Sequence, residues 1–438
     1  MSVDLIITLI RALIVAALTI LLAVPLARRL RSGSTVIWIF AVLPFLVPPL
    51  LTGYTYTNAH GVLGWPMLAR EGFYALLLVC RHLGPAAIVL ALARPKIGAS
   101  SRFALRMMTH PSLAMRMRTW FLGPGTGIVI AVLLVFLLAF LEFELASFFL
   151  VGSWSVKLFD AQVGGQQLAT SLQQAGGPFV IAALLLAGLI WRFRASQRLP
   201  DVESEPSRPG SSWPLWPALF LLFAWPLFDL LRDSLQGVQP LVQDFSIHRE
   251  VLTSLGFALV AAWLAGHVVA SERTAFRLVL TALPGLFGSL IIGLVLLRLF
   301  QQAVLHFAYD TPAPLLLGMI FSLLPMAVLL HLLADKYPHS GAFTAEMAHR
   351  PGAIRWVLVT RRKLAGFLSL FCLGWFDLTL GSLLAPSGMT PITARLYNFM
   401  HYGQSQVLSA MVLVTLLLPL LVMGFIYLTR RAWALSGR

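Results

Sequence analysis

The sequence predicts an all-α polytopic membrane protein with about 11 transmembrane helices, arranged as two tandem parallel repeats. Three observations support this fold class: the composition, apolar runs of spanning length, and paired motifs at a nearly constant offset. Of the 438 residues, 58% are hydrophobic and 11% are charged, whereas soluble domains carry about 25% charged residues. The composition therefore excludes a soluble globular fold.

Eleven apolar runs are long enough to be membrane spans. A spanning helix needs about 20 mainly apolar residues, because about 30 Å of hydrocarbon is crossed at 1.5 Å per residue. Inside lipid the backbone must be hydrogen-bonded within the segment, so these runs are predicted to be helices. They are residues 4–27, 35–57, 73–93, 125–151, 177–193, 214–232, 250–270, 276–299, 313–334, 364–386 and 406–429.

Basic residues gather on one side of these predicted spans. Of the 32 Lys and Arg residues, 24 fall in alternate loops and in the C-terminal tail. Basic segments resist translocation, so this side is predicted to be cytoplasmic, with the N-terminus outside and the C-terminus inside. The net charge of +15 is thus a topology signal, and the lipid bilayer rather than nucleic acid is the expected partner.

The spans divide into two predicted repeats with a linker between them. Residues 1–193 form the first repeat, with spans 1–5, and residues 194–213 form a cytosolic linker rich in Pro, Ser and Glu. Residues 214–438 form the second repeat, in which the extra span 214–232 precedes spans 7–11. Because the extra span restores the orientation, the two repeats are expected to be parallel.

An ordered series of paired motifs supports this division. Residues 157–160 and 165–166 (Lys-Leu-Phe-Asp, Gly-Gln) match residues 395–398 and 403–404 (Arg-Leu-Tyr-Asn, Gly-Gln) at an offset of 238. Further pairs at offsets of 235 or 240 are Leu43-Pro44 and Leu283-Pro284, Gly53 and Gly293, Pro111 and Pro351, Glu142 and Asp377, and Ser147 and Ser382. Such a series predicts a duplicated membrane unit, which is typical of transporters.

Two long basic loops, 94–123 and 335–363, occupy the same place in each repeat. Each contains a short helical stretch, a proline, and a second basic and apolar stretch, which predicts a bent pair of amphipathic helices. Two interpretations stay open: a loop bound to lipid headgroups, or a docking surface for a cytosolic partner. The occurrence of the same feature in both repeats favours the docking surface.

The second loop reads Glu-Met-Ala-His-Arg-Pro-Gly over residues 346–352, with Leu364 further on. This resembles the E-A-A-x3-G…L-P loop of ATP-binding-cassette importer permeases. Residues 395–404, together with Phe376-Asp377, resemble the two-domain permeases of the ferric-iron type, and the resemblance spans nearly the whole chain. It implies that a docking site for an ATPase includes Glu346, Ala348, Gly352 and Leu364, and at the matching positions of the first loop Arg106, Pro111 and Ser112.

The resemblance further implies two copies of a cytosolic ATPase and an extracytoplasmic solute-binding protein as partners, with iron(III) as the favoured cargo. ATP would be bound by the partner subunit only, and no cofactor is expected. The chain departs from the family pattern at Met347 and Ala365, where the family has alanine and proline. The first loop has neither the glutamate nor the glycine, so ATPase docking is expected chiefly at the second loop.

Three acidic residues inside predicted spans are candidates for the translocation path: Glu142, Glu144 and Asp377. A charge within a span costs about 2.5–3.5 kcal/mol, so it is usually buried or functional. These carboxylates either make structural hydrogen bonds or form an acidic lining for a cationic cargo. Further path candidates on the outer segments are Gly165, Gln166, Gly403 and Gln404.

Several motifs of enzymes are absent from the sequence. There is no G-x-x-x-x-G-K-[ST] phosphate loop, H-E-x-x-H, G-x-S-x-G or Cys-x-x-Cys motif. Cys80 and Cys372 each fall inside a predicted span, where they are expected to be small core residues. The chain is therefore expected to be neither an enzyme nor the holder of a metal site.

Three functions are compatible with these features. The first is the permease subunit of an ATP-binding-cassette importer in the bacterial cytoplasmic (inner) membrane, working by alternating access. The second is a secondary transporter driven by an ion gradient. The third is a divergent permease-like protein with a regulatory or scaffolding role.

Overall fold

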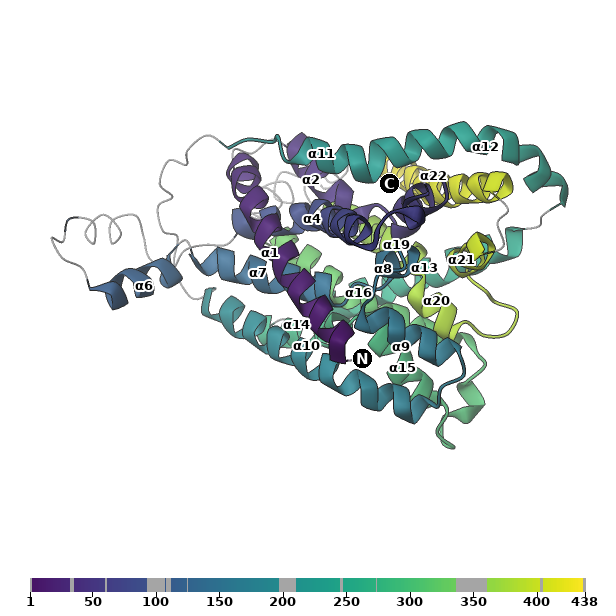
Figure 1. The fold of residues 1–438 in the computed structure, drawn as a ribbon. Helices are drawn as coiled ribbons and strands as arrows, with labels where there is room; N and C mark the ends of the chain where they lie inside the picture. The colour runs from purple at the N-terminus through teal and green to yellow at the C-terminus, as the bar shows by residue number, and fades with distance from the viewer. Residues whose placement is uncertain are drawn as a thin grey trace. The chain divides into compact units, whose positions relative to one another are not determined.

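The structure is a computed structural model in which every secondary-structure element of the described residues is a helix (Figure 1). The described residues are 2–31, 35–59, 61–92, 107, 112–123, 125–196, 210–244, 247–272, 274–335, 361–401 and 405–435. Within them, six helices are long and apolar enough to cross a membrane, or nine if each of three bent pairs is one span. The prediction of an all-α, multi-pass membrane protein is confirmed.

The chain divides into two compact units, Met1–Asp229 and Leu230–Arg438. The helices of the first unit are α1 (Ser2–Arg31), α2 (Thr35–Leu46), α3 (Pro49–Tyr54), η1 (Thr55–Ala59), η2 (Val62–Gly64), α4 (Met67–Leu92), α6 (Leu113–Leu122), α7 (Gly125–Phe140), α8 (Glu144–Phe148), α9 (Trp154–Val163), α10 (Leu168–Ser196), α11 (Leu215–Leu219) and η3 (Phe220–Ala224). Helix α12 (Trp225–Asp244) carries the chain across the boundary.

The helices of the second unit follow α12. They are α13 (His248–Ser271), α14 (Ala275–Ala282), η4 (Pro284–Phe287), α15 (Ser289–Phe300), η5 (His306–Ala308), α16 (Pro312–Asp335), α19 (Arg361–Trp375), α20 (Thr379–Leu384), α21 (Ile392–His401) and α22 (Ser405–Leu435).

In the first unit α1 packs against α4 and α7, and α4 also packs against α2 and α7. Helix α10 packs against α7 and α9, while the short helices α3 and α8 pack against each other. The extra span begins in this unit, since α11 packs on α2 and α4 and the Tyr56 hydroxyl donates to the Leu221 carbonyl at 2.8 Å.

The second unit has the same order of internal contacts. Helix α13 packs against α16 and α19, and α16 also packs against α14 and α19. Helix α22 packs against α19 and α21, while α15 packs against α20. The main contacts of α13, α14, α16 and α19 thus parallel those of α1, α2, α4 and α7.

Each of the eleven predicted apolar runs overlaps a helix of the structure, although several bounds differ. The run predicted at 177–193 begins earlier, at Leu168, because the polar residues before Gly176 continue the helix. The runs at 313–334 and 364–386 contain shorter apolar helices, Pro312–Val328 and Lys363–Trp375. The count of eleven spans stays a prediction, as do the two repeats.

Breaks within helices are a recurring feature of both units. Pro48 and Pro49 separate α2 from α3 with a bend of 65°, as expected because proline cannot donate the helical hydrogen bond. In the second unit Gly288, at φ +84°, separates η4 from α15 with a bend of 97°. Only glycine adopts such a backbone conformation readily.

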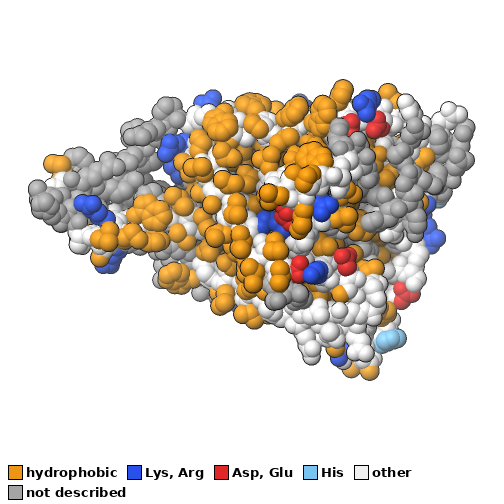
Figure 2. Space-filling view, in the orientation of Figure 1, with side chains coloured by type: hydrophobic (Ala, Val, Ile, Leu, Met, Phe, Trp, Pro, Cys, Tyr) orange, Lys and Arg blue, Asp and Glu red, His pale blue; other side chains and the backbone are white. Residues whose placement is uncertain are grey.

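Large apolar side chains are exposed along the candidate spans. Leu21 of α1, Leu184 of α10 and Phe425 of α22 are each more than 65% exposed. Figure 2 shows hydrophobic side chains over most of the face drawn, with charged side chains in a few small groups. A helix whose outer face is apolar fits a lipid environment.

Candidate functional site

The candidate site of the first unit lies at the break between α7 and α8, where Glu142 precedes α8. Its carboxylate accepts hydrogen bonds from the backbone N–H of Leu145 at 2.6 Å and of Ala146 at 3.1 Å. The Tyr74 hydroxyl of α4 donates a third bond at 2.6 Å. Because a carboxylate accepts the unpaired N–H groups at a helix start, Glu142 holds α8 in place and ties it to α4.

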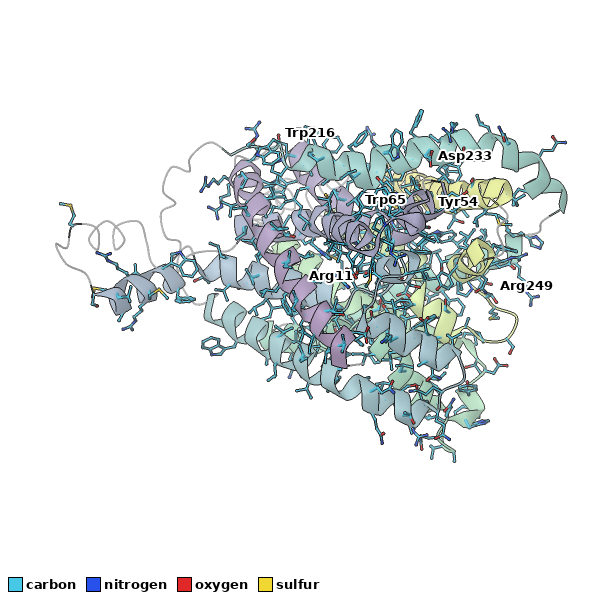
Figure 3. All side chains as sticks on the ribbon, viewed as in Figure 1. Arg11, Tyr54, Trp65, Trp216, Asp233 and Arg249 are labelled. Atoms are coloured by element: carbon cyan, nitrogen blue, oxygen red, sulfur yellow. The ribbon has the colours of Figure 1, made fainter. Side chains whose placement is uncertain are left out.

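A buried ion pair lies beside this carboxylate. Arg11 of α1, labelled in Figure 3, is 6% exposed and forms two hydrogen bonds of 3.0 Å with Glu71. Its guanidinium also donates to the Gly152 carbonyl at 2.8 Å and lies 5.1 Å from the centre of the Tyr74 ring. Glu71 therefore neutralises Arg11 inside the unit.

The candidate site of the second unit lies at the break between α19 and α20, where Asp377 precedes α20. Its Oδ1 accepts a hydrogen bond of 2.9 Å from the Leu380 backbone N–H. Its Oδ2 faces the hydroxyls of Ser322 and Ser289 at 3.3 Å and 3.4 Å. Within the described residues, no Lys, Arg or His forms an ion pair with this carboxylate.

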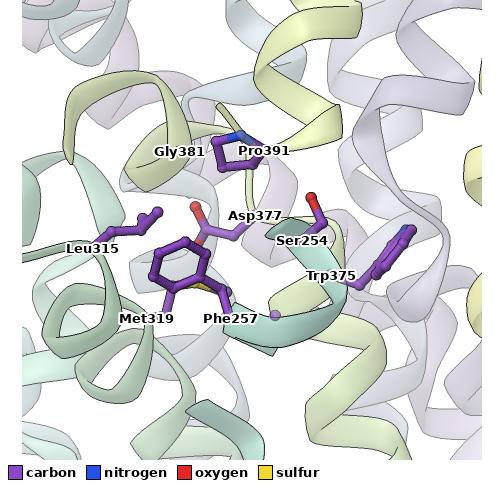
Figure 4. A pocket seen from close by; sticks show the side chains of 9 residues that line it. Ser254, Phe257, Leu315, Met319, Trp375, Asp377, Gly381 and Pro391 are labelled. Atoms are coloured by element: carbon purple, nitrogen blue, oxygen red, sulfur yellow. The ribbon is translucent and has the colours of Figure 1, made fainter. Parts of the chain in front are cut away.

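A small pocket adjoins Asp377. Figure 4 shows the carboxylate pointing into the space between Leu315, Phe257 and Pro391. The other residues of the pocket are Ser254, Met319, Gly374, Trp375 and Gly381. Apart from Asp377, only Ser254 lines this space with a polar side chain, so the pocket is a largely apolar surrounding for one carboxylate.

Further hydrogen bonds recur at matched places in the two units. The Ser155 hydroxyl donates to the Glu142 carbonyl at 3.0 Å, and the Thr393 hydroxyl donates to the Asp377 carbonyl at 3.0 Å. These bonds tie the start of α9 and of α21 to the break that precedes α8 and α20. The acidic residue at each break is therefore held through both its carboxylate and its backbone carbonyl.

The first helix of each unit provides a second pair of matched bonds. The Thr8 hydroxyl of α1 accepts from the Trp154 backbone N–H at 3.4 Å. In the second unit the Ser254 hydroxyl of α13 accepts from the Ile392 backbone N–H at 2.9 Å. The Thr8 hydroxyl thus holds the start of α9, and the Ser254 hydroxyl holds the start of α21.

An ion pair joins the same elements in each unit. Asp4 of α1 pairs with Lys157 of α9, with 2.6 Å between Oδ2 and Nζ. Glu250 of α13 pairs with Arg395 of α21. The sequence reasoning singled out Lys157 and Arg395 but missed their acidic partners, because the partners are separated by 246 residues rather than 238.

Two glycines allow close packing of the short helices. A side chain at Gly53 of α3 would lie 2.5 Å from the Phe148 ring of α8, and one at Gly293 of α15 would lie 2.7 Å from Leu383. The sequence comparison paired Gly53 with Gly293, and in the structure each of them faces a large apolar side chain of the short helix packed against it. A larger residue is excluded unless the facing side chain moves.

The remaining described candidates lie apart from these bonds. Glu144 is the half-buried first residue of α8. Gly165 has φ +88°, and the Gln166 amide donates to the Ser171 hydroxyl at 3.2 Å. Ser112 caps α6 by accepting from the Met115 N–H at 3.2 Å, and Leu364 is half-buried on α19.

Seven candidates lie outside the described residues. They are Arg106, Pro111, Glu346, Ala348, Gly352, Gly403 and Gln404. Most residues of the predicted ATPase-docking site are among them, so this docking site stays a prediction. The described ranges contain no group of three or more His, Cys, Asp or Glu side chains placed to hold a metal ion.

The geometry defines the class of the molecule: a helical membrane protein with broken helices whose breaks carry half-buried carboxylates. No family model, curated protein or solved structure matches the chain. The function therefore has to be argued from the residues themselves.

Proposed function

We propose that the chain is a transport protein formed by tandem duplication of one membrane unit. The recurrence of the same bonds at corresponding helix breaks carries this proposal. In each unit an acidic side chain of α1 or α13 pairs with a basic side chain of α9 or α21. A hydroxyl of α1 or α13 accepts a hydrogen bond from the first backbone N–H of α9 or α21. A carboxylate accepts a hydrogen bond from the start of the short helix α8 or α20. Duplicated membrane units with discontinuous helices are typical of transporters, whose substrates bind near the breaks.

Within this class, the permease subunit of an ATP-binding-cassette importer is the function we favour. Its support is the resemblance of residues 346–352 to the docking loop of such permeases, together with the position of the same loop in both halves. Two ATPase subunits would dock on the cytoplasmic loops, and a solute-binding protein would deliver iron(III) or another small solute from outside. Closure of the ATPase pair would then drive alternating access.

Co-purification tests this coupling. The full chain, expressed with an ATP-binding-cassette ATPase encoded by a neighbouring gene, should retain that ATPase through purification in detergent. Glu346→Gln combined with Gly352→Ala should abolish retention, whereas Glu272→Gln, on another loop predicted to be cytoplasmic, should leave it unchanged. Retention by the double variant would contradict docking at this loop.

A second function, transport driven by an ion gradient, is favoured by one observation. Asp377 is a carboxylate in an apolar pocket with no ion pair among the described residues, and such groups commonly bind coupling ions in membrane transporters. Uptake into proteoliposomes that contain no ATPase would support this function and contradict the importer. Absence of uptake both with and without the ATPase would leave a regulatory or scaffolding role.

A further inference from the structure

Three oxygen atoms of the second unit converge where its two broken helices meet. Ser289 is the first residue of α15, directly after the 97° bend, and Asp377 lies at the break before α20. Ser322, from the middle of α16, completes the group. All three belong to the same compact unit.

The spacing of these oxygens is wide for hydrogen bonds. Asp377 Oδ2 lies 3.3 Å from Ser322 Oγ and 3.4 Å from Ser289 Oγ, whereas hydroxyl-to-carboxylate bonds are usually about 2.5–2.7 Å. The Tyr74 hydroxyl reaches Glu142 at 2.6 Å in the first unit. The two serine hydroxyls therefore lie near Asp377 Oδ2, but farther from it than in a short hydrogen bond.

Among the described residues, no positively charged side chain forms an ion pair with Asp377. Glu142 accepts three hydrogen bonds and has the Arg11–Glu71 pair nearby, joined through Tyr74. Asp377 accepts one backbone bond and two long bonds from serine hydroxyls, and its pocket is lined mainly by apolar groups such as Phe257 and Leu315. A charge in apolar surroundings without an ion-pair partner is costly, so a bound cation would stabilise the ionised form of this carboxylate.

We propose that Asp377, Ser289 and Ser322 bind a monovalent metal cation of the size of Na⁺. Two oxygens at right angles around an ion, each about 2.4 Å from it, lie about 3.4 Å apart, which agrees with the spacing of the serine and aspartate oxygens. One positive charge neutralises one carboxylate, whereas a divalent ion would leave an uncompensated charge in an apolar surrounding.

The ion would join three elements that already pack against one another. It would hold the start of α15 and the break before α20 against α16, with a ligand from each. Bound Na⁺ should therefore stabilise the second unit, since a ligand that binds only the folded state raises its stability. This inference does not depend on whether the chain is coupled to an ATPase.

Thermal unfolding of the purified full chain in detergent tests the site. The Tm should rise by a few degrees when NaCl replaces choline chloride at constant ionic strength, and the rise should saturate. Asp377→Asn should abolish the rise. Ser289→Ala combined with Ser322→Ala should raise the half-saturating Na⁺ concentration by about tenfold.

Glu142→Gln is the matched control, because it changes the corresponding carboxylate of the first unit and should keep the response to Na⁺. Binding of radioactive Na⁺ to the immobilised protein provides a second measurement for variants of low stability. A wild-type protein that shows no saturable Na⁺ effect by either method would overturn the proposal. An equal effect in wild type and Asp377→Asn would do the same.

Discussion

The two carboxylates at the helix breaks differ in their surroundings, although both stabilise a short helix. Glu142 is held by Tyr74 and two backbone N–H groups, and Arg11 lies over the Tyr74 ring. Asp377 faces two serines and an apolar pocket. The bonds of Glu142 favour a structural role, while those of Asp377 leave room for a ligand.

Removing the Tyr74 hydroxyl should weaken the first unit. Tyr74→Phe keeps the ring under Arg11 but removes a 2.6 Å bond to Glu142. Loss of a buried bond to a charged group costs about 1.5–3 kcal/mol, so the Tm in detergent should fall. Tyr309→Phe is the control because its ring is 37% exposed. Equal changes in the two variants would contradict the role of Tyr74.

The two matched ion pairs should differ in strength. The Lys157 side chain is 56% exposed, whereas Arg395 is 28% exposed and lies over the Phe399 ring at 5.3 Å. Lys157→Met should therefore cost at most about 1 kcal/mol, and Arg395→Met about 1–3 kcal/mol because the Arg395 side chain is less exposed to solvent. Denaturant titration of both variants checks the order. The reverse order would show that exposure does not determine these energies.

At the level of elements, the short helices α3, α8, α15 and α20 distinguish this fold from a bundle of straight spans. Each follows a break, and the pairs α3 with α8 and α15 with α20 pack closely through a glycine. The breaks place polar groups inside the units. This arrangement requires a small residue at Gly53 and Gly293.

Adding a methyl group at Gly293 should destabilise the second unit. The Cβ would lie 2.7 Å from Leu383, and such overpacking costs about 1–3 kcal/mol. Leu383→Ala should restore part of the stability in the double variant Gly293→Ala/Leu383→Ala. Gly256→Ala on α13, where nothing lies within 4 Å, should be neutral or stabilising because alanine favours a helix. Destabilisation by Gly256→Ala alone would contradict the packing argument.

At the level of the whole molecule, the sequence predicted the helical membrane class and eleven apolar runs that each overlap a helix. It paired Glu142 with Asp377 and Gly53 with Gly293, because the offset between the halves changes little from the second span onward. It missed the bonds of Asp4, Thr8 and their counterparts. Their offset is 246, and a hydrogen bond to a backbone group does not produce a recognisable residue pattern in a sequence.

The burial of Arg11 and the asymmetry of the two breaks were also beyond the sequence. The partner of Arg11, Glu71, is 60 residues away and meets it only through the packing of α1 on α4. The environment of Asp377 likewise depends on α13, α15 and α16. Periodicity indicates which segments are helices and does not specify which side chains meet.

The central claim is that the two units are parallel copies, and labelling from one side of the membrane tests it most directly. In a background with Cys80 and Cys372 replaced by alanine, single cysteines are introduced at the exposed positions Val163, Met389, Met117 and Ser271. A membrane-impermeant maleimide added to intact cells should label Val163→Cys and Met389→Cys, and should leave Met117→Cys and Ser271→Cys unlabelled until the membrane is opened. Labelling of Val163→Cys and Met389→Cys from opposite sides would contradict parallel copies.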